Sequence, residues 1–110
     1  MNEQLATLGV LQVRETRVLS ISGEIDISNA GELRDALARF DHETPLAIDM
    51  TDVRYIDSTG LNAIAQYGRA QLEAGNDLFL IVTREPLRKL FEITNFDQYF
   101  TILTTLDDLP

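Results

Sequence analysis

Apolar and polar residues alternate in two short segments near the start of the chain. Residues 10–14 and 17–22 are rich in β-branched and other apolar side chains, and Glu15 and Thr16 separate them. This pattern predicts a β-hairpin. Residues 23–28, which include two acidic side chains, then form a connection to the next element.

A helix is predicted after the hairpin, because apolar residues recur every three or four positions from Asn29 to Phe40. Asn29 and Glu32 have the spacing of a capping box, in which two side chains satisfy backbone N–H groups at the helix start. The polar segment 41–45 ends in a proline and terminates this helix.

The middle of the chain predicts a buried strand, a loop and a long helix. Residues 46–48 form a short apolar run, and the loop 51–57 follows it. Three large side chains of this loop are expected to point inward: Val53, Tyr55 and Ile56. Apolar residues at helical spacing then predict a helix over residues 58–74, which Gly75 ends.

Gly68 lies inside this long helix, where a glycine costs about 1 kcal/mol relative to alanine. It indicates either a close approach of another backbone or a tolerated position on the surface.

Residues 78–82 are the clearest strand. Pro86 suits the first turn of a third helix, and Asn95 ends that helix. Residues 101–103 add a weaker final strand, and residues 106–110 a short terminal turn.

The predicted order is therefore β-β-α-β-α-β-α-β. Helices that alternate with apolar strands indicate right-handed crossovers and a mostly parallel sheet. The first strand is antiparallel to the second and lies at the edge. The expected fold class is α/β, with helices packed on a mixed sheet.

Composition limits the class of protein. The chain has 110 residues, 45% of them hydrophobic, so a single domain over residues 1–110 is expected. The net charge of −9 disfavours direct binding to nucleic acid, since phosphates would be repelled. Neither a signal peptide nor an apolar run long enough to span a bilayer is present, so a cytoplasmic protein without membrane insertion is expected. Nothing in the sequence demands more than a monomer.

Motifs for catalysis and cofactor binding are missing from the sequence. The single histidine, His42, lies in a polar turn and is expected to be a solvated loop residue. No Gly-x-Ser-x-Gly motif surrounds Ser58, and no Gly-x-x-x-x-Gly-Lys loop exists to bind a nucleotide triphosphate. The chain has no cysteine, which excludes disulfides and thiolate metal sites. We expect no cofactor and no catalytic residue.

Three aspartates near the middle of the chain allow two further interpretations. Asp49, Asp52 and Asp57 suggest a magnesium site, but their spacing matches no ligand motif and such residues commonly end strands and turns. A phosphoaspartate receiver would need a lysine near these acids, and nothing places the only lysine, Lys89, there. No metal site is therefore expected.

Ser58 stands at the predicted start of the long helix, directly after Asp57. Serine is among the commonest N-cap residues, so one interpretation is purely structural. The other is chemical, because unpaired N–H groups at a helix start favour an anion and would stabilise a phosphate on this hydroxyl.

The segments around Ser58 resemble those of the STAS domain, and in particular of bacterial anti-sigma factor antagonists (anti-anti-sigma factors). The resemblance rests on Gly-Glu-Ile-Asp at 23–26, Leu-Arg-Asp-Ala-Leu at 33–37, and Ile-Asp-Met-Thr-Asp-Val at 48–53, followed by Ile-Asp-Ser-Thr-Gly-Leu at 56–61. It covers almost the whole chain. The isolated Asp-Ser-Thr-Gly is a weak motif, and the upstream segments at the proper distance make it strong.

The resemblance implies a regulator of transcription. In that family an unmodified antagonist binds an anti-sigma factor that is also a serine kinase, which frees a sigma factor. The kinase phosphorylates the antagonist and a serine phosphatase resets it. Carried onto this chain, the phosphoacceptor is Ser58. Thr59, where many relatives have a second serine, is an alternative acceptor.

The resemblance also implies a docking surface around the acceptor. It comprises the loop 23–28, the turn 57–60 and the exposed face of the next helix, where Asn62 replaces a frequent glycine. The residues expected to contact the partner are Glu24, Asp26, Ser28, Asp57, Ser58, Thr59, Gly60 and Asn62.

Two alternative functions remain open from the sequence. One is a non-switching STAS subunit of a transporter or of a stressosome-type assembly, in which Ser58 would be a structural cap. The other is a nucleotide hydrolase, for which the sequence offers no catalytic residues.

Overall fold

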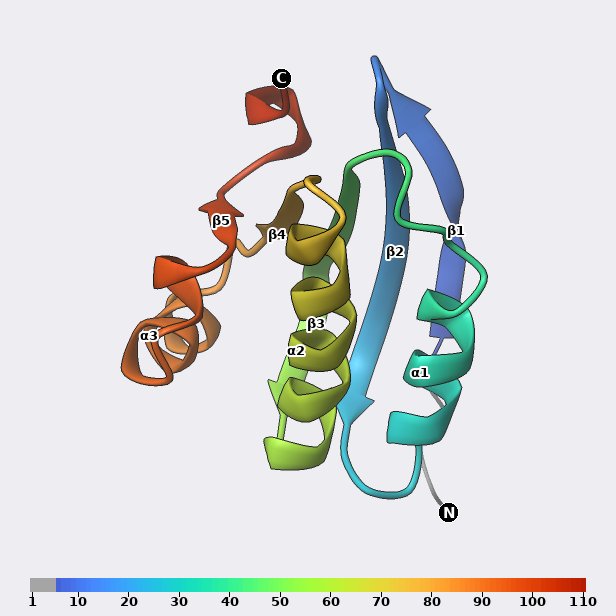
Figure 1. Cartoon of the computed structure of the whole chain (residues 1–110). Coiled ribbons are helices and arrows are strands. Elements are labelled where there is room, and N and C mark those ends of the chain that lie inside the picture. The colour runs from blue at the N-terminus through green and yellow to red at the C-terminus, as the bar shows by residue number, and fades with distance from the viewer. Residues whose placement is uncertain (1–5) are drawn as a thin grey trace.

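The computed structural model describes the backbone of residues 6–110 and the side chains of residues 9–110. Its five strands form one sheet in the order β1-β2-β3-β4-β5 (Figure 1). Strand β1 is antiparallel to β2, and the remaining neighbours are parallel. The strands are β1 (Ala6–Val13), β2 (Thr16–Ile25), β3 (Leu46–Ile56), β4 (Leu78–Ile81) and β5 (Thr101–Leu103). The predicted fold class, the order of strands and helices along the chain and the antiparallel edge strand are confirmed.

Helices α1 (Ala30–Leu37) and α2 (Ser58–Glu73) lie side by side on one face of the sheet (Figure 1). Helix α3 (Glu85–Ile93) lies beside β5, at the far edge from β1. Two short 3-10 helices follow it, η1 (Phe96–Gln98) and η2 (Leu106–Asp108). No helix within residues 6–110 has the length and hydropathy that a membrane crossing requires.

The main core fills the space between the sheet and the helices. Its largest fully buried side chains include Leu19, Ile48, Ile64, Leu80 and Phe91. A smaller cluster lies apart from this core and comprises Val18, Ala47, Phe79, Ile81 and Leu109. In this second cluster Leu109, near the chain end, is buried beside strand residues, and the Arg14 side chain donates a hydrogen bond to its carbonyl.

Strands β2 and β3 are longer than the sequence predicts. Residues 23–25 and 51–56, expected to be connections, are the paired ends of these strands, and Ile25 lies opposite Ile56. The pairing shifts register twice, between Ser20 and Ser22 and between Gly23 and Glu24. These irregularities interrupt the alternation of buried and exposed residues, which is why the pattern did not indicate strands.

The expected inward orientation is correct for Val53 and Ile56 and wrong for Tyr55. Val53 and Ile56 are at most 3% exposed, whereas Tyr55 is 52% exposed. The physical reason is that two consecutive residues before Ile56 face outward in β3, so only every third side chain reaches the core there.

Helix α1 ends at Leu37 rather than at Phe40, and the predicted capping box does not form. Asn29 precedes the helix, but its side chain makes no capping hydrogen bond there. Phe40 is still buried, as its spacing predicts, although residues 38–40 form turns.

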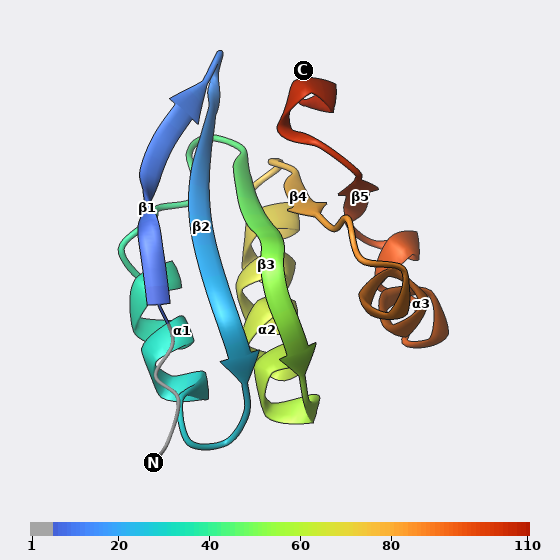
Figure 2. The ribbon, with the colours of Figure 1, turned by 180° about the vertical axis from the view of Figure 1, so that it is seen from behind.

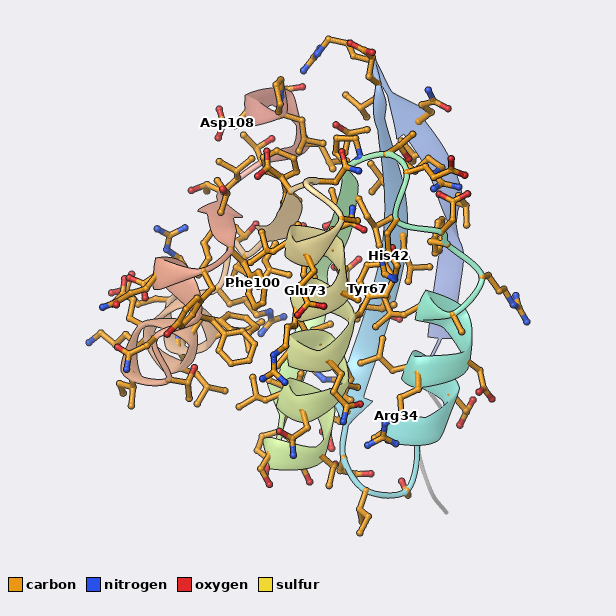
Figure 3. All side chains as sticks on the ribbon, in the orientation of Figure 1. Arg34, His42, Tyr67, Glu73, Phe100 and Asp108 are labelled. Carbon is orange, nitrogen blue, oxygen red and sulfur yellow. The ribbon has the colours of Figure 1, made fainter. Side chains whose placement is uncertain are left out.

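The prediction that His42 is a loop residue is correct, but its side chain is partly buried and makes contacts rather than being solvated. Its ring lies 4.7 Å from that of Tyr67, and the two side chains are labelled in Figure 3. Its Nδ1 is 2.8 Å from the Oε1 of the fully buried Gln71. The Gln71 Nε2 donates to the carbonyls of Thr44 and Asp77. Helix α2 therefore holds the segment after α1 through partly buried polar contacts, which a single isolated histidine in the sequence does not reveal.

Gly68 marks a close approach, but to a side chain rather than to a backbone. A Cβ at this position would lie 2.4 Å from two ring atoms of Phe100. The glycine lowers the stability of the helix, but it leaves room for the Phe100 ring to pack against the helix backbone.

Candidate functional site

The ends of β2 and β3 bring two loops together. Ile25 and Ile56 are paired in the sheet, and the backbone N–H of Asp57 donates to the Ile25 carbonyl at 3.0 Å. The connection from β2 to α1 and the start of α2 therefore lie at the same end of the sheet (Figures 1 and 2). Sites in α/β folds commonly form at this carboxyl edge of parallel strands.

Asp57, and not Ser58, caps helix α2. Its Oδ1 accepts hydrogen bonds from the backbone N–H groups of Thr59 at 2.9 Å and Gly60 at 3.2 Å. It also accepts the Thr59 hydroxyl at 2.5 Å. This hydroxyl, followed by the backbone N–H groups, lowers the pKa of the Asp57 carboxyl below its usual range. The purely structural interpretation of Ser58 as the cap is therefore wrong.

Ser58 is exposed at the first turn of α2. Its hydroxyl has no hydrogen-bond partner among the side chains and backbone groups that the structure describes, and it adjoins the N-terminal end of a 16-residue helix. Charges of negative sign are favoured there by the helix dipole. The position combines access from solvent with a favourable field for an anion.

Gly60 lets the start of α2 pack tightly on the strand ends. A Cβ here would lie 2.6 Å from Ile56 Cγ1 and 2.7 Å from Ile25 Cγ2. The absence of a side chain at Gly60 therefore fixes how closely the helix approaches β2 and β3, and with it the height of Ser58 above the sheet.

The β2–α1 loop is held by the side chain of Asn29, which is 2% exposed. Its Oδ1 accepts the backbone N–H of Asp26 at 2.9 Å, and its Nδ2 donates to the Glu24 carbonyl at 2.7 Å. The Asp26 carboxylate in turn accepts the backbone N–H of Ser28 at 2.9 Å and its hydroxyl at 2.5 Å. This network orders the loop and leaves Glu24 and Ser28 exposed.

All eight predicted contact residues thus belong to one end of the sheet. Glu24, Ser28, Ser58 and Asn62 are exposed, and Asp26, Asp57 and Thr59 are partly so. Gly60 is buried, so it shapes this surface rather than lining it.

Sequence reasoning missed a groove on the other side of Ser58. It has a volume of about 520 Å³, and among the residues that line it are Tyr55, Ser58, Leu61, Pro86 and Leu90. Its walls come from the end of β3, the start of α2 and helix α3, which no spacing rule brings together. Ile27, which is 81% exposed on the β2–α1 loop, was also overlooked. Its only signal in the sequence is an isolated apolar residue between polar neighbours.

Two of the three aspartates considered for magnesium make separate contacts within the chain. Asp49 accepts the backbone N–H and the hydroxyl of Thr51, while Asp57 caps α2. Within residues 9–110, no three side chains of histidine, aspartate or glutamate form a group that could hold a metal ion.

Comparison with known proteins identifies the family. The family model of the STAS domain matches residues 8–109. The anti-sigma-B factor antagonist of Listeria monocytogenes is 32% identical over 84 residues, which are 74% of each chain. The anti-sigma-F factor antagonist RsfB of Mycobacterium tuberculosis is 31% identical over 106 residues, which are 93% of this chain and 84% of that protein.

A solved structure agrees with these relatives in fold. The crystal structure of an anti-sigma factor antagonist from Mycobacterium paratuberculosis has a TM-score of 0.80 and 28% identity. The match covers 94% of this chain and 89% of the other. The chain therefore belongs to the STAS domain family, as a relative of the anti-sigma factor antagonists.

Proposed function

We propose that this protein is an anti-sigma factor antagonist that is controlled by phosphorylation of Ser58. In the unmodified form it binds an anti-sigma factor that is also a serine kinase, and this binding frees a sigma factor. Phosphorylation ends the binding, and a serine phosphatase restores it. The protein acts in the cytoplasm as a single-domain substrate of these enzymes and performs no catalysis itself. The names of the relatives support the general role.

One observation carries the choice of acceptor. The Ser58 hydroxyl is exposed and has no partner among the described residues, whereas the neighbouring Thr59 hydroxyl donates to Asp57 at 2.5 Å. A kinase must reach the hydroxyl and remove its proton as the phosphoryl group is transferred. Thr59 would have to give up a hydrogen bond to a carboxylate first, so Ser58 is the favoured acceptor.

The charge of a phosphate explains how the switch works. Phosphorylation adds about −1.5 to −2 charges at neutral pH. In the free protein the helix start offsets part of this cost, by about 0.3–1 kcal/mol for an exposed site. The fold therefore tolerates the modified serine.

When the kinase is bound, the phosphate becomes unfavourable. The phosphate would lie beside the Asp57 carboxylate and near a loop that carries Glu24 and Asp26, and it would lose its water. An unpaired charge buried in an interface costs about 2–5 kcal/mol. Each 1.4 kcal/mol corresponds to about a tenfold change in affinity. Release of the partner therefore needs no large change of conformation.

The groove beside Ser58 suits a partner protein. Tyr55 is half-exposed and lines it together with Leu61, Pro86 and Leu90. Aromatic residues are enriched among the side chains that dominate binding energy at interfaces. A kinase bound across Ser58 would cover this apolar surface and would exclude water from the acceptor.

Binding of the cognate anti-sigma kinase to three variants tests the proposal. Ser58→Ala should bind about as tightly as the wild type, since it removes a hydroxyl without adding charge. Ser58→Asp should bind at least about tenfold more weakly, which corresponds to about 1.4 kcal/mol. Gln66→Glu adds the same charge at an exposed position two turns further along α2 and serves as the matched control.

Each outcome discriminates between functions. Loss of binding in Ser58→Asp alone supports the switch. Wild-type binding by Ser58→Asp, together with loss of binding by Ser58→Ala, would overturn it. Recovery of a transporter ATPase in place of a kinase would instead favour a non-switching STAS subunit.

A further inference from the structure

A second hollow lies between α2 and the segment that joins α3 to β5. Its volume is about 400 Å³, within the range of about 300–1,000 Å³ that is common for small-molecule sites. Arg69, on its α2 side, follows Ser58 by three helical turns, which places the hollow about 16 Å further along the helix axis. Its lining residues are Ala65, Arg69, Leu72, Thr94, Phe96, Tyr99 and Phe100.

Aromatic rings form much of the lining. Phe100 is packed so closely on the helix that a Cβ at Gly68 would lie 2.4 Å from its ring, and Figure 3 shows it on the side of α2 that faces α3. The Phe96 ring meets it edge-on, with 5.6 Å between ring centroids. Tyr99 adds a third ring 6.5 Å from that of Phe100. A flat apolar group would find edge and face contacts here, which aromatic pairs prefer.

Two large side chains of the lining remain in contact with water. Tyr99 is 68% exposed and Leu72 is 38% exposed. Both would lose water contact when the hollow is occupied, and burial of apolar area contributes about 25 cal/mol per Å². The hollow is therefore open to a ligand, and burial of its exposed apolar area would favour binding.

Arg69 supplies a cation at this apolar surface. It is exposed, and its side chain makes no hydrogen bond, ion pair or ring contact with the part of the chain that the structure describes. Arg17 shows the contrast, since it pairs with Asp41 at 2.9 Å and lies over the Phe40 ring. The chain has 18 acidic residues and only 9 lysines and arginines, so carboxylate partners are abundant. The Arg69 guanidinium is nevertheless left for an anion from outside.

We propose that this hollow binds a small aromatic carboxylate. The ring lies against Phe96, Tyr99 and Phe100, and the carboxylate accepts hydrogen bonds from the Arg69 guanidinium. The planar guanidinium presents paired donors that match the two oxygens of a carboxylate. This site involves neither Ser58 nor its docking surface and goes beyond the proposed function.

Two probes of nearly the same shape test the site in NMR titrations of the 15N-labelled full chain. Indole-3-acetate carries the carboxylate, and indole-3-acetamide replaces it with a neutral amide. The acetate should shift amide signals within residues 65–72 and 94–100, and the acetamide should bind about tenfold more weakly, equivalent to about 1.4 kcal/mol. Arg69→Leu should reduce acetate binding to the level of the acetamide and leave acetamide binding unchanged.

A matched variant and a dilution series complete the test. Arg39→Leu removes another exposed arginine outside the hollow and should leave both affinities unchanged. Equal binding of the two probes, shifts spread over the whole surface, or no effect of Arg69→Leu would overturn the proposal. Shifts of the same residues on raising the protein concentration without probe would also overturn it, since they would identify a second copy as the occupant.

Discussion

The hydroxyl of Thr59 donates to the Asp57 carboxylate at 2.5 Å, while the hydroxyl of Ser58 between them is left exposed. The three consecutive residues therefore have different roles at the start of α2. Asp57 caps the N-terminus of the helix, and the Thr59 hydroxyl orients the Asp57 carboxylate. Ser58 is left available for chemistry, because neither neighbour uses it.

Thr59→Val should raise the pKa of Asp57 towards its ordinary value of 3.8, because the Thr59 hydroxyl is the largest of the contacts that lower it. A carboxyl with a lowered pKa stabilises the fold above its ordinary pKa, and this contribution is lost as the pH falls through the folded-state pKa. The wild type should therefore be more stable than Thr59→Val at neutral pH, and the difference should shrink in acid. NMR titration of the Asp57 carboxyl and denaturant unfolding measure both effects. An unchanged Asp57 pKa would contradict this assignment.

Gly60→Ala should destabilise the protein by about 1–3 kcal/mol, the usual cost of overpacking a tight site. The added Cβ would meet Ile56 and Ile25 at 2.6–2.7 Å. Gly31→Ala is the matched control, because nothing lies within 4 Å of a Cβ there and α1 gains a better helix former. Urea denaturation should thus show a loss for Gly60→Ala and a small gain for Gly31→Ala. Losses of equal size would refute the packing argument.

Asn29→Ala should disorder the β2–α1 loop. It removes the hydrogen bonds of the Asn29 side chain to the Asp26 N–H and the Glu24 carbonyl, each of which contributes about 0.5–1.5 kcal/mol. Amide hydrogen exchange should accelerate within residues 24–29 and remain slow in β4. Binding of the anti-sigma kinase should weaken, since the loop is part of the proposed docking surface. Exchange that stays slow in the loop would show that other contacts hold it.

The protein should lose stability at high pH because of the buried Tyr67 hydroxyl. Burial raises the pKa of this hydroxyl to about 12, and the hydroxyl donates to the Asp41 carbonyl at 3.2 Å. A raised tyrosine pKa means that the fold favours the neutral form, so its contribution is present below the ordinary value of 10 and is lost between pH 10 and about 12. Unfolding free energies of wild type and Tyr67→Phe should diverge in this interval, with the wild type losing more. Parallel curves would contradict the assignment.

The sequence predicts the order and direction of the elements well, because each rests on local patterns. The helix over residues 58–74 and the strand over residues 78–82 have clear periodicities and match α2 and β4 closely. The ends of β2 and β3 were not predicted. They depend on register shifts and on pairing between distant residues, which leave no regular period in either segment.

The candidate site likewise combines features that local sequence patterns predict with features that depend on the folded structure. The start of α2 and its serine are visible in the sequence, but the choice of Asp57 over Ser58 as cap depends on side-chain geometry. The role of Asn29 was predicted to be helix capping, since its spacing to Glu32 suggests it. Its side chain instead forms hydrogen bonds with the Asp26 N–H and the Glu24 carbonyl of the β2–α1 loop, because the end of β2 brings both groups within reach. The groove beside Ser58 required the packing of α3 near β3, which only the fold supplies.

The most direct test of the account is the mass of the protein after incubation with ATP and the cognate anti-sigma kinase. The wild type and Thr59→Val should each gain the mass of one phosphate, and fragment analysis should place it on Ser58. Ser58→Ala should gain none while remaining folded and able to bind the kinase. Phosphate on Thr59, or undiminished phosphorylation of Ser58→Ala, would contradict the assignment of Ser58 as the switch.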